Sequence, residues 1–325
     1  MSSKKYITPT IPEDFIPCDW NEGDNLIDTN SLLVDKYIRD DTEELLLNMS
    51  REILDIPKNN IIKLTGGSDT AILHVLSFAS SLGYKEFRMR DNDYAQVKAF
   101  AGTTNMDVEI VPNEKIFNDI KSHSVIYFSN PCNPTGEIIE ADLIYKVCES
   151  NPTCLFLLDN AYIEFHPSYD FKSMLQIENL INFRTFSKYW GFSGARLGAI
   201  IFNDKNKLSK SLSVLNSKHI SILHKHVIEN IYRNKNLYIE KRKKEDQILR
   251  EIAKRISKIF DTDYEIAGNF ARFDCASYNV KQELVSFFNE KKIAIRDLGH
   301  LPNYKFTVRF SYREKAAEAL GAINP

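Results

Sequence analysis

The sequence predicts an α/β fold, in which a large domain holds a mostly parallel central sheet between helices and a smaller α+β domain is attached. Three observations support this prediction. The chain has 325 residues, of which 43% are hydrophobic, so it is long and apolar enough to bury a sizeable core. From about residue 61 to residue 202, apolar runs of strand length alternate with amphipathic stretches of helical length. After residue 260, short strands surround a single helix.

Four candidate strands define the predicted parallel sheet. Each is a short apolar run that is followed by a turn or a polar cluster, as expected for a strand that is buried on both faces. They are residues 124–128, 154–158, 182–186 and 197–202.

The first helix of this region is predicted to begin near Ser68. The Ser68 side chain can cap the N-terminus, and Asp69 suits the positive end of the helix dipole. Gly66 and Gly67 precede the helix, so its free N–H groups are available to an anion such as phosphate. The apolar stripe has helical spacing and comprises Ala71, Ile72, Val75, Leu76, Ala79 and Leu82.

The pattern from about residue 205 to residue 260 is helical. One buried face is predicted there, formed by Leu249, Ile252, Ile256 and Ile259. The basic run at residues 241–244 is interpreted as a solvated helix face, because acidic residues flank it. We divide the chain into a large domain of residues 38–215 and a small domain made of residues 1–37 and 216–325.

Composition argues against several classes of partner. The 42 basic and 44 acidic residues give a net charge of −2, which does not favour nucleic-acid binding. No apolar run approaches the roughly 20 residues of a membrane span, and the first residues do not resemble a secretory signal, so we expect a cytoplasmic protein.

No metal site is predicted. The five cysteines are scattered and never form a CxxC pair, so neither a disulfide framework nor a zinc site is indicated. Three histidines lie close together in the helical region, but they lack the spacing of metal ligands and are interpreted as helix-surface residues; they are His219, His224 and His226.

Six of the 12 glycines gather in three segments that end or follow candidate strands. The first segment is Gly66 and Gly67, the second is the turn NPCNPTG at residues 130–136, and the third is SKYWGFSGARLG at residues 187–198. Asp159 follows another strand. Because the carboxyl ends of parallel strands meet at one edge of a sheet, we expect a ligand crevice there. A lysine held at that edge and partly desolvated, as Lys188 would be, favours a nucleophilic amine.

Together these segments resemble the fold type I pyridoxal-phosphate enzymes, specifically the class I/II aminotransferases near histidinol-phosphate aminotransferase. Residues 130–136 are similar to the family's NPxNPTG turn. Residues 159–162, which read DNAY, are similar to its DxxY element, and residues 187–198 to its SKxxGxxGxRxG loop. The resemblance is strong over about residues 60–200 and implies an aspartate-aminotransferase-like fold with pyridoxal 5'-phosphate as cofactor.

The resemblance also implies catalytic roles. Lys188 would form the Schiff base with the cofactor aldehyde and then act as general base and acid. Asp159 would pair with the pyridine nitrogen and keep it protonated, so that the ring can accept electrons. Asn133 and Tyr162 would hydrogen-bond the ring oxygen.

Further cofactor contacts follow from the same resemblance. The phosphate would be held at the helix N-terminus by backbone and side-chain donors, and the set is Gly67, Ser68, Asp69, Ser187 and Arg196. Tyr94 would stack on the pyridine ring. Tyr37 would reach the phosphate of the other subunit, which implies a homodimer.

On the substrate side, Arg309 matches the family arginine that grips the α-carboxylate with a bidentate fork, and Asn133 is expected to contact the substrate as well. The chain departs from the family at two places that bear on the substrate. Asn160 stands where close relatives often carry an acid, and the segment after Arg309 lacks the usual glycine-bearing turn.

The function implied is a pyridoxal-phosphate-dependent aminotransferase. It would move an amino group from an amino acid donor, with glutamate expected, to a small oxo acceptor with or without a phosphate group. Two alternatives stay open. One is decarboxylation of a phosphorylated amino acid, as in relatives that resemble threonine-phosphate decarboxylase, because sequence does not show which substrate bond lies perpendicular to the ring. The other is a non-catalytic ligand-binding protein on the same fold.

Overall fold

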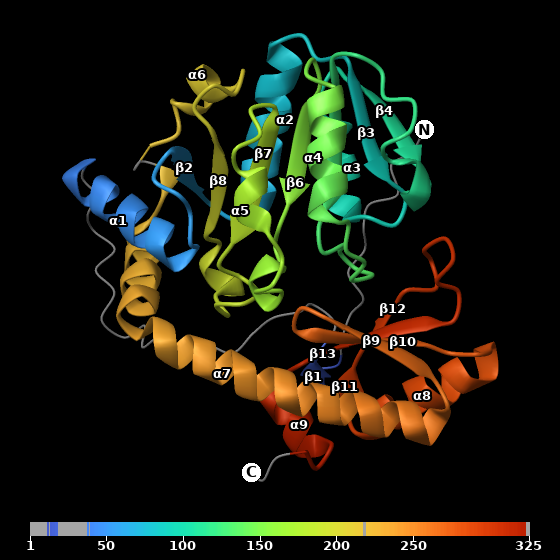
Figure 1. Cartoon of the computed structure of the whole chain (residues 1–325). Coiled ribbons are helices and arrows are strands. Elements are labelled where there is room, and N and C mark those ends of the chain that lie inside the picture. Colours follow the sequence, from blue (N-terminus) through green and yellow to red (C-terminus); the bar gives the residue numbers. More distant parts are fainter. Residues whose placement is uncertain (1–11, 13, 19–37, 39, 217–218, 323–325) are drawn as a thin grey trace.

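The computed structural model describes residues 12, 14–18, 38, 40–216 and 219–322. A large sheet with helices on both faces forms one part of the molecule (Figure 1). A smaller sheet with its own helices forms the other part, and the long helix α7 (Ile222–Phe260) runs along both. In the described part, no helix combines the length and apolar character that a bilayer span requires.

The large sheet has seven strands in the order β2-β8-β7-β6-β5-β3-β4. Strand β8 is antiparallel to both of its neighbours, and the other pairings are parallel, which confirms the mostly parallel sheet. The strands are β2 (Asn60–Thr65), β3 (Glu86–Arg90), β4 (Asp107–Val111), β5 (Ser124–Ser129), β6 (Leu155–Asp159), β7 (Leu180–Thr185) and β8 (Gly198–Asn203). All four predicted strands are present, with bounds that differ by one or two residues.

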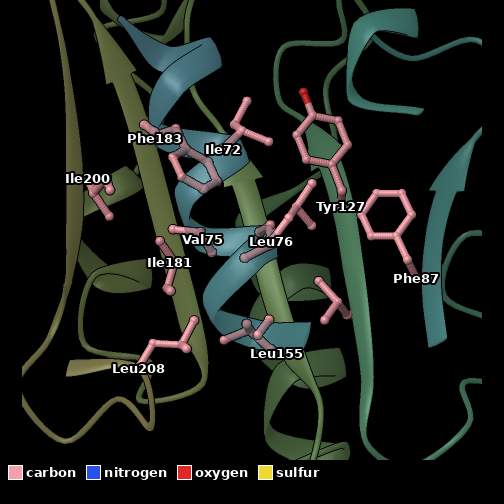
Figure 2. Packing of buried hydrophobic residues seen from close by; sticks show 14 of the residues in the cluster. Ile72, Val75, Leu76, Phe87, Tyr127, Leu155, Ile181, Phe183, Ile200 and Leu208 are labelled. Atoms are coloured by element: carbon pink, nitrogen blue, oxygen red, sulfur yellow. The ribbon is translucent and has the colours of Figure 1, made fainter. Parts of the chain in front are cut away.

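Helices cover both faces of this sheet because alternate residues of each strand point to opposite sides. Tyr127 of β5 packs in the cluster that includes the apolar face of α2, whereas its neighbours Ile126 and Phe128 pack with Ile144 of α4 (Figures 1 and 2). The helices are α1 (Asp40–Ile53), α2 (Ser68–Ser81), α3 (Ala95–Ala101), α4 (Ala141–Ser150), α5 (Phe171–Met174) and α6 (Ser209–Leu212), with 3₁₀ turns at η1 (Asn113–Lys115), η2 (Ile163–Phe165) and η3 (Ser193–Ala195).

Helix α2 follows the predicted stripe except at its two ends. Leu82 is 52% exposed, because the helix ends at Ser81 and Leu82 forms its C-cap. The predicted N-cap was also wrong. Gly67, with φ of 97°, holds that position, and Ser68 is already the first helical residue. The left-handed φ explains this, since glycine adopts it without the strain that a serine would carry.

The smaller sheet is antiparallel, with strand order β12-β13-β10-β9. Strand β9 was not predicted, because three of its five side chains are exposed and it lacks an apolar run. The elements are β9 (Asp263–Ala267), β10 (Phe270–Asp274), α8 (Tyr278–Glu290), β12 (Arg296–Asp297), β13 (Thr307–Ser311) and α9 (Glu314–Ala319), and a parallel pair joins β1 (Ile16–Pro17) to β11 (Ile293–Ala294).

Helix α7 contributes to two cores. Its first part packs with α1 and the large sheet through Val227 and Ile231, and its last part packs against the smaller sheet through Leu249 and Ile256. Ile259, predicted to be on the same buried face, is 61% exposed near the end of the helix. Because one helix joins both cores, the division at residues 215 and 216 stays a prediction.

Two side chains of α7 were wrongly predicted to face solvent. Arg242, in the basic run, is buried and pairs with Glu245, and its Nε donates to the backbone carbonyl of Tyr189. His224 is buried as well, with its Nε2 2.8 Å from the carbonyl oxygen of Ala195. Both lie where α7 crosses the loop after β7, which the helical periodicity alone does not reveal.

Candidate active site

The carboxyl ends of β5, β6 and β7 meet at the edge of the large sheet that faces the smaller sheet (Figure 1). Asp159 is the last residue of β6 and lies directly opposite Ser129, the last residue of β5. Lys188 follows β7 by three residues. The residues that the sequence placed after separate strands are therefore brought to one edge.

Asp159 is a buried carboxyl group. Its oxygens accept hydrogen bonds from the Tyr127 hydroxyl at 3.0 Å and from the backbone N–H of Ala161 at 3.1 Å. The pKa of Asp159 is raised to about 7, chiefly by burial and in part by the negative charges of Asp93 and Asp69, while the hydrogen bonds from Tyr127 and Ala161 oppose the shift. Such a carboxyl gains a stable negative charge when a cation binds beside it, as a protonated ring nitrogen would.

Lys188 and Tyr162 lie close together at the same edge of the sheet. The Lys188 ammonium nitrogen is 5.9 Å from the centre of the Tyr162 ring. Tyr162 is buried and packs edge to face on Phe270 of the smaller sheet, with ring centres 5.6 Å apart. A Cβ at Gly268 would come within 2.6 Å of Tyr162, so the hairpin turn between β9 and β10 can approach this tyrosine only with glycine.

A second part of the site surrounds the N-terminus of α2. The backbones of Gly67 and Gly198 touch, since a Cβ at Gly198 would lie 2.6 Å from the carbonyl carbon of Gly67 and from the Ser68 nitrogen. Arg196 extends over Gly67 and pairs with Asp69 at 3.0 Å. A helix N-terminus and a guanidinium therefore converge, which suits an anion. Asp69 orients this arginine, although its predicted role was a phosphate contact.

Tyr94 and Ser187 lie at this edge too. Tyr94 forms the N-cap of α3, and burial raises the pKa of its hydroxyl, with further contributions from Asp69, Asp159 and Tyr162. Those contributions indicate that Tyr94 lies between the two parts of the site. The Ser187 hydroxyl is buried and accepts a hydrogen bond from the Thr185 hydroxyl at 3.0 Å.

The smaller sheet supplies Arg309. This arginine is buried in β13, lies 5.0 Å from the centre of the Phe270 ring and donates to the Asn133 side-chain oxygen at 3.4 Å. Asn133 belongs to the NPCNPTG turn after β5, so the two predicted substrate residues come together from opposite sides of the site.

Sequence reasoning missed a row of arginines around Arg309. In the register of the small sheet, Arg309 lies directly opposite Arg272 on one side and Arg296 on the other. Residues that are directly opposite point to the same face of a sheet. Arg272 forms ion pairs with Glu265 and Asp274, and it donates a hydrogen bond to the Thr135 carbonyl at 2.6 Å. Arg296 is partly buried, and that burial lowers its pKa.

Three predictions have further outcomes. Tyr37 lies outside the described residues. Asn160, the departure from the family's acid, is buried and is hydrogen-bonded by the Asn182 side chain while it donates to the Asn130 carbonyl, so an amide network occupies that position. Within the described ranges, no group of three or more histidine, cysteine, aspartate or glutamate side chains is placed to hold a metal ion.

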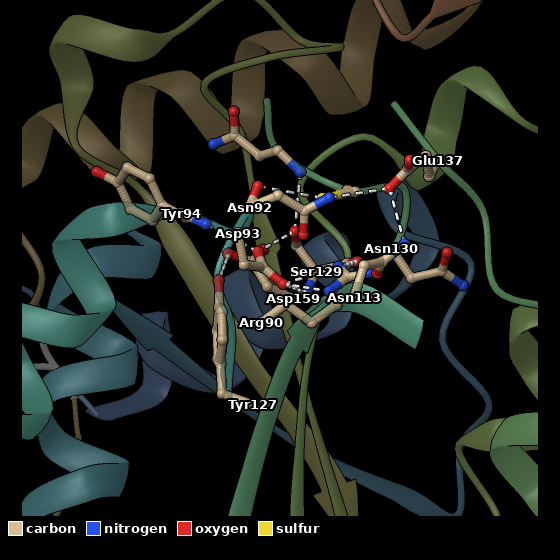
Figure 3. Close-up of polar contacts among 12 residues, drawn as sticks. Arg90, Asn92, Asp93, Tyr94, Asn113, Tyr127, Ser129, Asn130, Glu137 and Asp159 are labelled. Atoms are coloured by element: carbon tan, nitrogen blue, oxygen red, sulfur yellow. Dashed lines mark hydrogen bonds and ion pairs between the residues drawn. The ribbon is translucent and has the colours of Figure 1, made fainter. Parts of the chain in front are cut away.

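Sequence reasoning also missed polar groups behind the edge, which Figure 3 shows as a connected set. The connected groups are Arg90, Asp93, Asn113, Ser129 and Glu137. Tyr127 is drawn beside them and is hydrogen-bonded to Asp159. One signal was available. Tyr127 and Ser129 are polar residues at alternate positions of a strand that is mostly apolar, and they therefore share one face.

Comparison with known proteins agrees with this geometry. The family model described as aminotransferase class I and II matches residues 40–286. The histidinol-phosphate aminotransferase of Buchnera aphidicola subsp. Cinara cedri is 28% identical over 226 residues, which are 64% of this chain and 59% of that protein. That of Thermotoga neapolitana is 25% identical over 79% of this chain and 76% of its own length.

A solved structure has the same fold. A putative histidinol-phosphate aminotransferase from Erwinia carotovora atroseptica superposes with a TM-score of 0.74 at 20% identity, and 97% of each chain is covered. The family match covers more than half of the chain and includes every predicted site residue except Tyr37 and Arg309. The chain therefore belongs to the aminotransferase class I and II family.

Proposed function

We propose that this aminotransferase moves the amino group of glutamate to a small oxo acceptor that carries an anionic group such as a phosphate. The observation that carries the proposal is Arg296 beside Arg309 on the face of the small sheet that meets the Asn133 turn. Arg309 suits the α-carboxylate of an amino acid. Arg296 suits a second anionic group one strand away, which is a γ-carboxylate in glutamate or a phosphate in the acceptor.

The cofactor of this family is pyridoxal phosphate, and the residues present fit it. The contact of Gly67 with Gly198 leaves a cradle without side chains at a helix N-terminus, and Arg196 adds a positive charge, so a phosphate fits. The buried carboxyl of Asp159 has a pKa near 7 and gains a partner in a protonated pyridine nitrogen. When bound, pyridoxal phosphate supplies an aldehyde that joins amines and a ring that accepts electrons.

Each residue then has a defined task. The Lys188 amine would hold the cofactor covalently and, once released, would move a proton from the substrate Cα. Tyr162 and Asn133 would hold the ring oxygen by hydrogen bonds. Tyr94 would lie against the ring, and Arg309 would fix the α-carboxylate of the substrate.

The net reaction balances without an added oxidant or reductant. Glutamate loses its amino group and becomes 2-oxoglutarate, while the acceptor exchanges its oxo group for an amino group. Only the two halves together return the lysine to its starting state. The protein therefore needs the donor, the acceptor and pyridoxal phosphate.

The test mixes the purified holoenzyme with glutamate and paired oxo acceptors that differ only in a phosphate group. We expect 2-oxoglutarate to form, with kcat/KM higher for the phosphorylated member of each pair. Release of carbon dioxide from a phosphorylated amino acid, without any oxo acid, would overturn the proposal in favour of a decarboxylase. Equal kcat/KM values for both members of each pair would overturn the claim that the acceptor carries an anionic group.

Three further statements belong to this proposal. We infer a homodimer, because the resemblance assigns Tyr37 to the phosphate of the other subunit; light scattering of the holoenzyme tests it, and a monomer would contradict it. We infer a cytoplasmic protein, which is supported by five buried cysteines that form no disulfide. We also propose the division into a large domain of residues 38–215 and a small domain of the remainder, which limited proteolysis near residue 216 would test.

A further inference from the structure

Two side chains of β5 point from the sheet toward the site. Tyr127 and Ser129 are two residues apart, so they project from the same face of the strand. In the pairing of β5 with β6, Tyr127 lies opposite Leu157 and Ser129 lies opposite Asp159. Both side chains are buried. Neither was assigned to the site by sequence motif.

Tyr127 contacts the residue that faces the ring nitrogen. Its hydroxyl donates to Oδ2 of Asp159 at 3.0 Å, while Oδ1 of Asp159 accepts from the backbone of Ala161. The two donors approach different oxygens, so they fix the rotation of the carboxyl group. Removal of the Tyr127 hydroxyl would leave one oxygen without this protein donor.

Ser129 contacts the residue that faces the ring oxygen. Its hydroxyl accepts a hydrogen bond from the backbone N–H of Asn133 at 2.9 Å and donates to the carboxylate of Asp93 (Figure 3). Ser129 therefore ties Asn133, in the middle of the NPCNPTG turn, to the buried carboxylate of Asp93. The position of the Asn133 amide, which also receives Arg309, depends on that tie.

Asp93 is the fixed end of this chain of contacts. It is buried and paired with Arg90, whose Nε and Nη2 donate to Oδ2 at 2.9 and 2.7 Å. The same carboxylate accepts from the backbone N–H of Ser129 at 3.0 Å and from that of Tyr94 at 2.8 Å. One buried carboxylate therefore orders both the turn that carries Asn133 and the residue that lies against the ring.

We propose that Tyr127 and Ser129 are positioning residues that set, from one strand, the two polar ends of the bound pyridine ring. Tyr127 holds the Asp159 carboxyl for the nitrogen, and Ser129, anchored on Asp93, holds Asn133 for the oxygen. The proposal rests on the proposed function, since it takes pyridoxal phosphate as the ligand. It adds two residues that act through others and do not themselves touch the ring.

The test uses two single substitutions with matched controls. Tyr127→Phe removes one hydroxyl and keeps the ring that packs in the core, and Ser129→Ala removes only the hydroxyl between Asn133 and Asp93. The controls make the same chemical changes away from the site. Tyr84→Phe alters a buried tyrosine of the same apolar cluster, and Ser50→Ala alters a buried serine of α1.

Two readouts other than turnover separate a positioning role from a structural one. The first is the dissociation constant of pyridoxal phosphate. It is measured by adding pyridoxal phosphate to the cofactor-free protein and following its visible absorbance. We expect Tyr127→Phe and Ser129→Ala each to weaken binding by about 2- to 10-fold, the effect of losing one hydrogen bond. The second is the pH midpoint of the bound cofactor's absorbance, which Ser129→Ala should shift because the contact to the ring oxygen changes.

The outcomes are distinct. If both site variants bind the cofactor like their controls and keep the wild-type pH midpoint, the positioning proposal is wrong while the proposed function stands. If the wild-type protein binds no pyridoxal phosphate, the proposed function itself fails. Should one variant lose its fold, which circular dichroism would show, the other still decides, because Tyr127 and Ser129 act on different site residues.

Discussion

The two halves of the active site are built in different ways. The cofactor half lies at the carboxyl edge of the large sheet, where Asp159 ends β6 and Lys188 follows the neighbouring strand β7, each within a short motif. The substrate half lies on an antiparallel sheet, where Arg309 acquires its neighbours through strand register. One half is therefore local in sequence, and the other exists only after strands distant in sequence have paired.

This difference predicts how each half responds to change. Variants of the cofactor half should lose the cofactor, and with it every step of the reaction. Variants of the substrate half should keep a normal cofactor spectrum and weaken only the use of substrate.

The largest effect is expected from Lys188→Ala. Without the Lys188 amine, the protein lacks the group that attaches the cofactor covalently and the group that transfers a proton at the substrate Cα. We expect kcat to fall by at least about 100- to 10,000-fold, the usual contribution of general acid–base catalysis alone. Steady-state turnover and the visible absorbance of the holoenzyme check this, and a variant with near wild-type turnover would contradict it.

A smaller and different effect is expected from Arg309→Gln. The bidentate contact to the α-carboxylate is lost while the cofactor half is intact, so KM for glutamate should rise by about 10- to 100-fold. The absorbance of the bound cofactor should be unchanged. The control is Lys315→Gln in α9, which also replaces a cationic side chain with glutamine. Loss of cofactor in the Arg309 variant would break the contrast between the two halves.

The third prediction concerns pH and Asp159. In the cofactor-free protein the pKa of this carboxyl is about 7, against an ordinary value of 3.8, so between these values the folded state holds a proton that the unfolded state has released. The free energy of unfolding should therefore fall as pH rises through that window, by up to about 1 kcal/mol per pH unit from this group.

Denaturant unfolding of the cofactor-free protein at several pH values measures that slope. Asp159→Asn removes the titrating group, so its slope over the same window should be shallower than that of the wild type. Parallel slopes for the two proteins would show that Asp159 does not hold a proton in the folded state.

A further effect is expected at the phosphate cradle. In Gly198→Ala the added Cβ would lie 2.6 Å from the backbone of Gly67 and Ser68, so the cradle must open, at a cost of about 1 to 3 kcal/mol in stability. Cofactor affinity should fall as well. Gly194→Ala is the control from the same loop, because its Cβ meets nothing within 4 Å. Equal melting temperatures for the two variants would contradict this account of the cradle.

The features that could be predicted from the sequence are those that depend on residues close together in the chain. The four strands of the large sheet and the buried stripe of α2 were found because each depends on neighbours within a few residues. The burial of Arg242 and His224 was missed, since it depends on where α7 crosses a loop that lies far away in sequence. Strand β9 was missed because its side chains are mostly exposed and leave no apolar signal.

The same difference between local and distant sequence dependence is seen for single residues of the site. Asp159, Lys188 and Asn133 stand in motifs that a sequence displays directly. Arg296 and Arg309 are in neighbouring strands but 13 positions apart in sequence, and only the pairing of β12 with β13 sets them side by side. The Asn160 departure had no explanation until the fold placed the Asn182 amide against it.

The central claim is that the Lys188 amine is the group that binds the cofactor aldehyde. The most direct test reduces the holoenzyme with borohydride, digests it and maps the pyridoxyl group by mass spectrometry. The account predicts that the group is on Lys188. A pyridoxyl group on another lysine, or an unlabelled Lys188 in protein saturated with the cofactor, would contradict it.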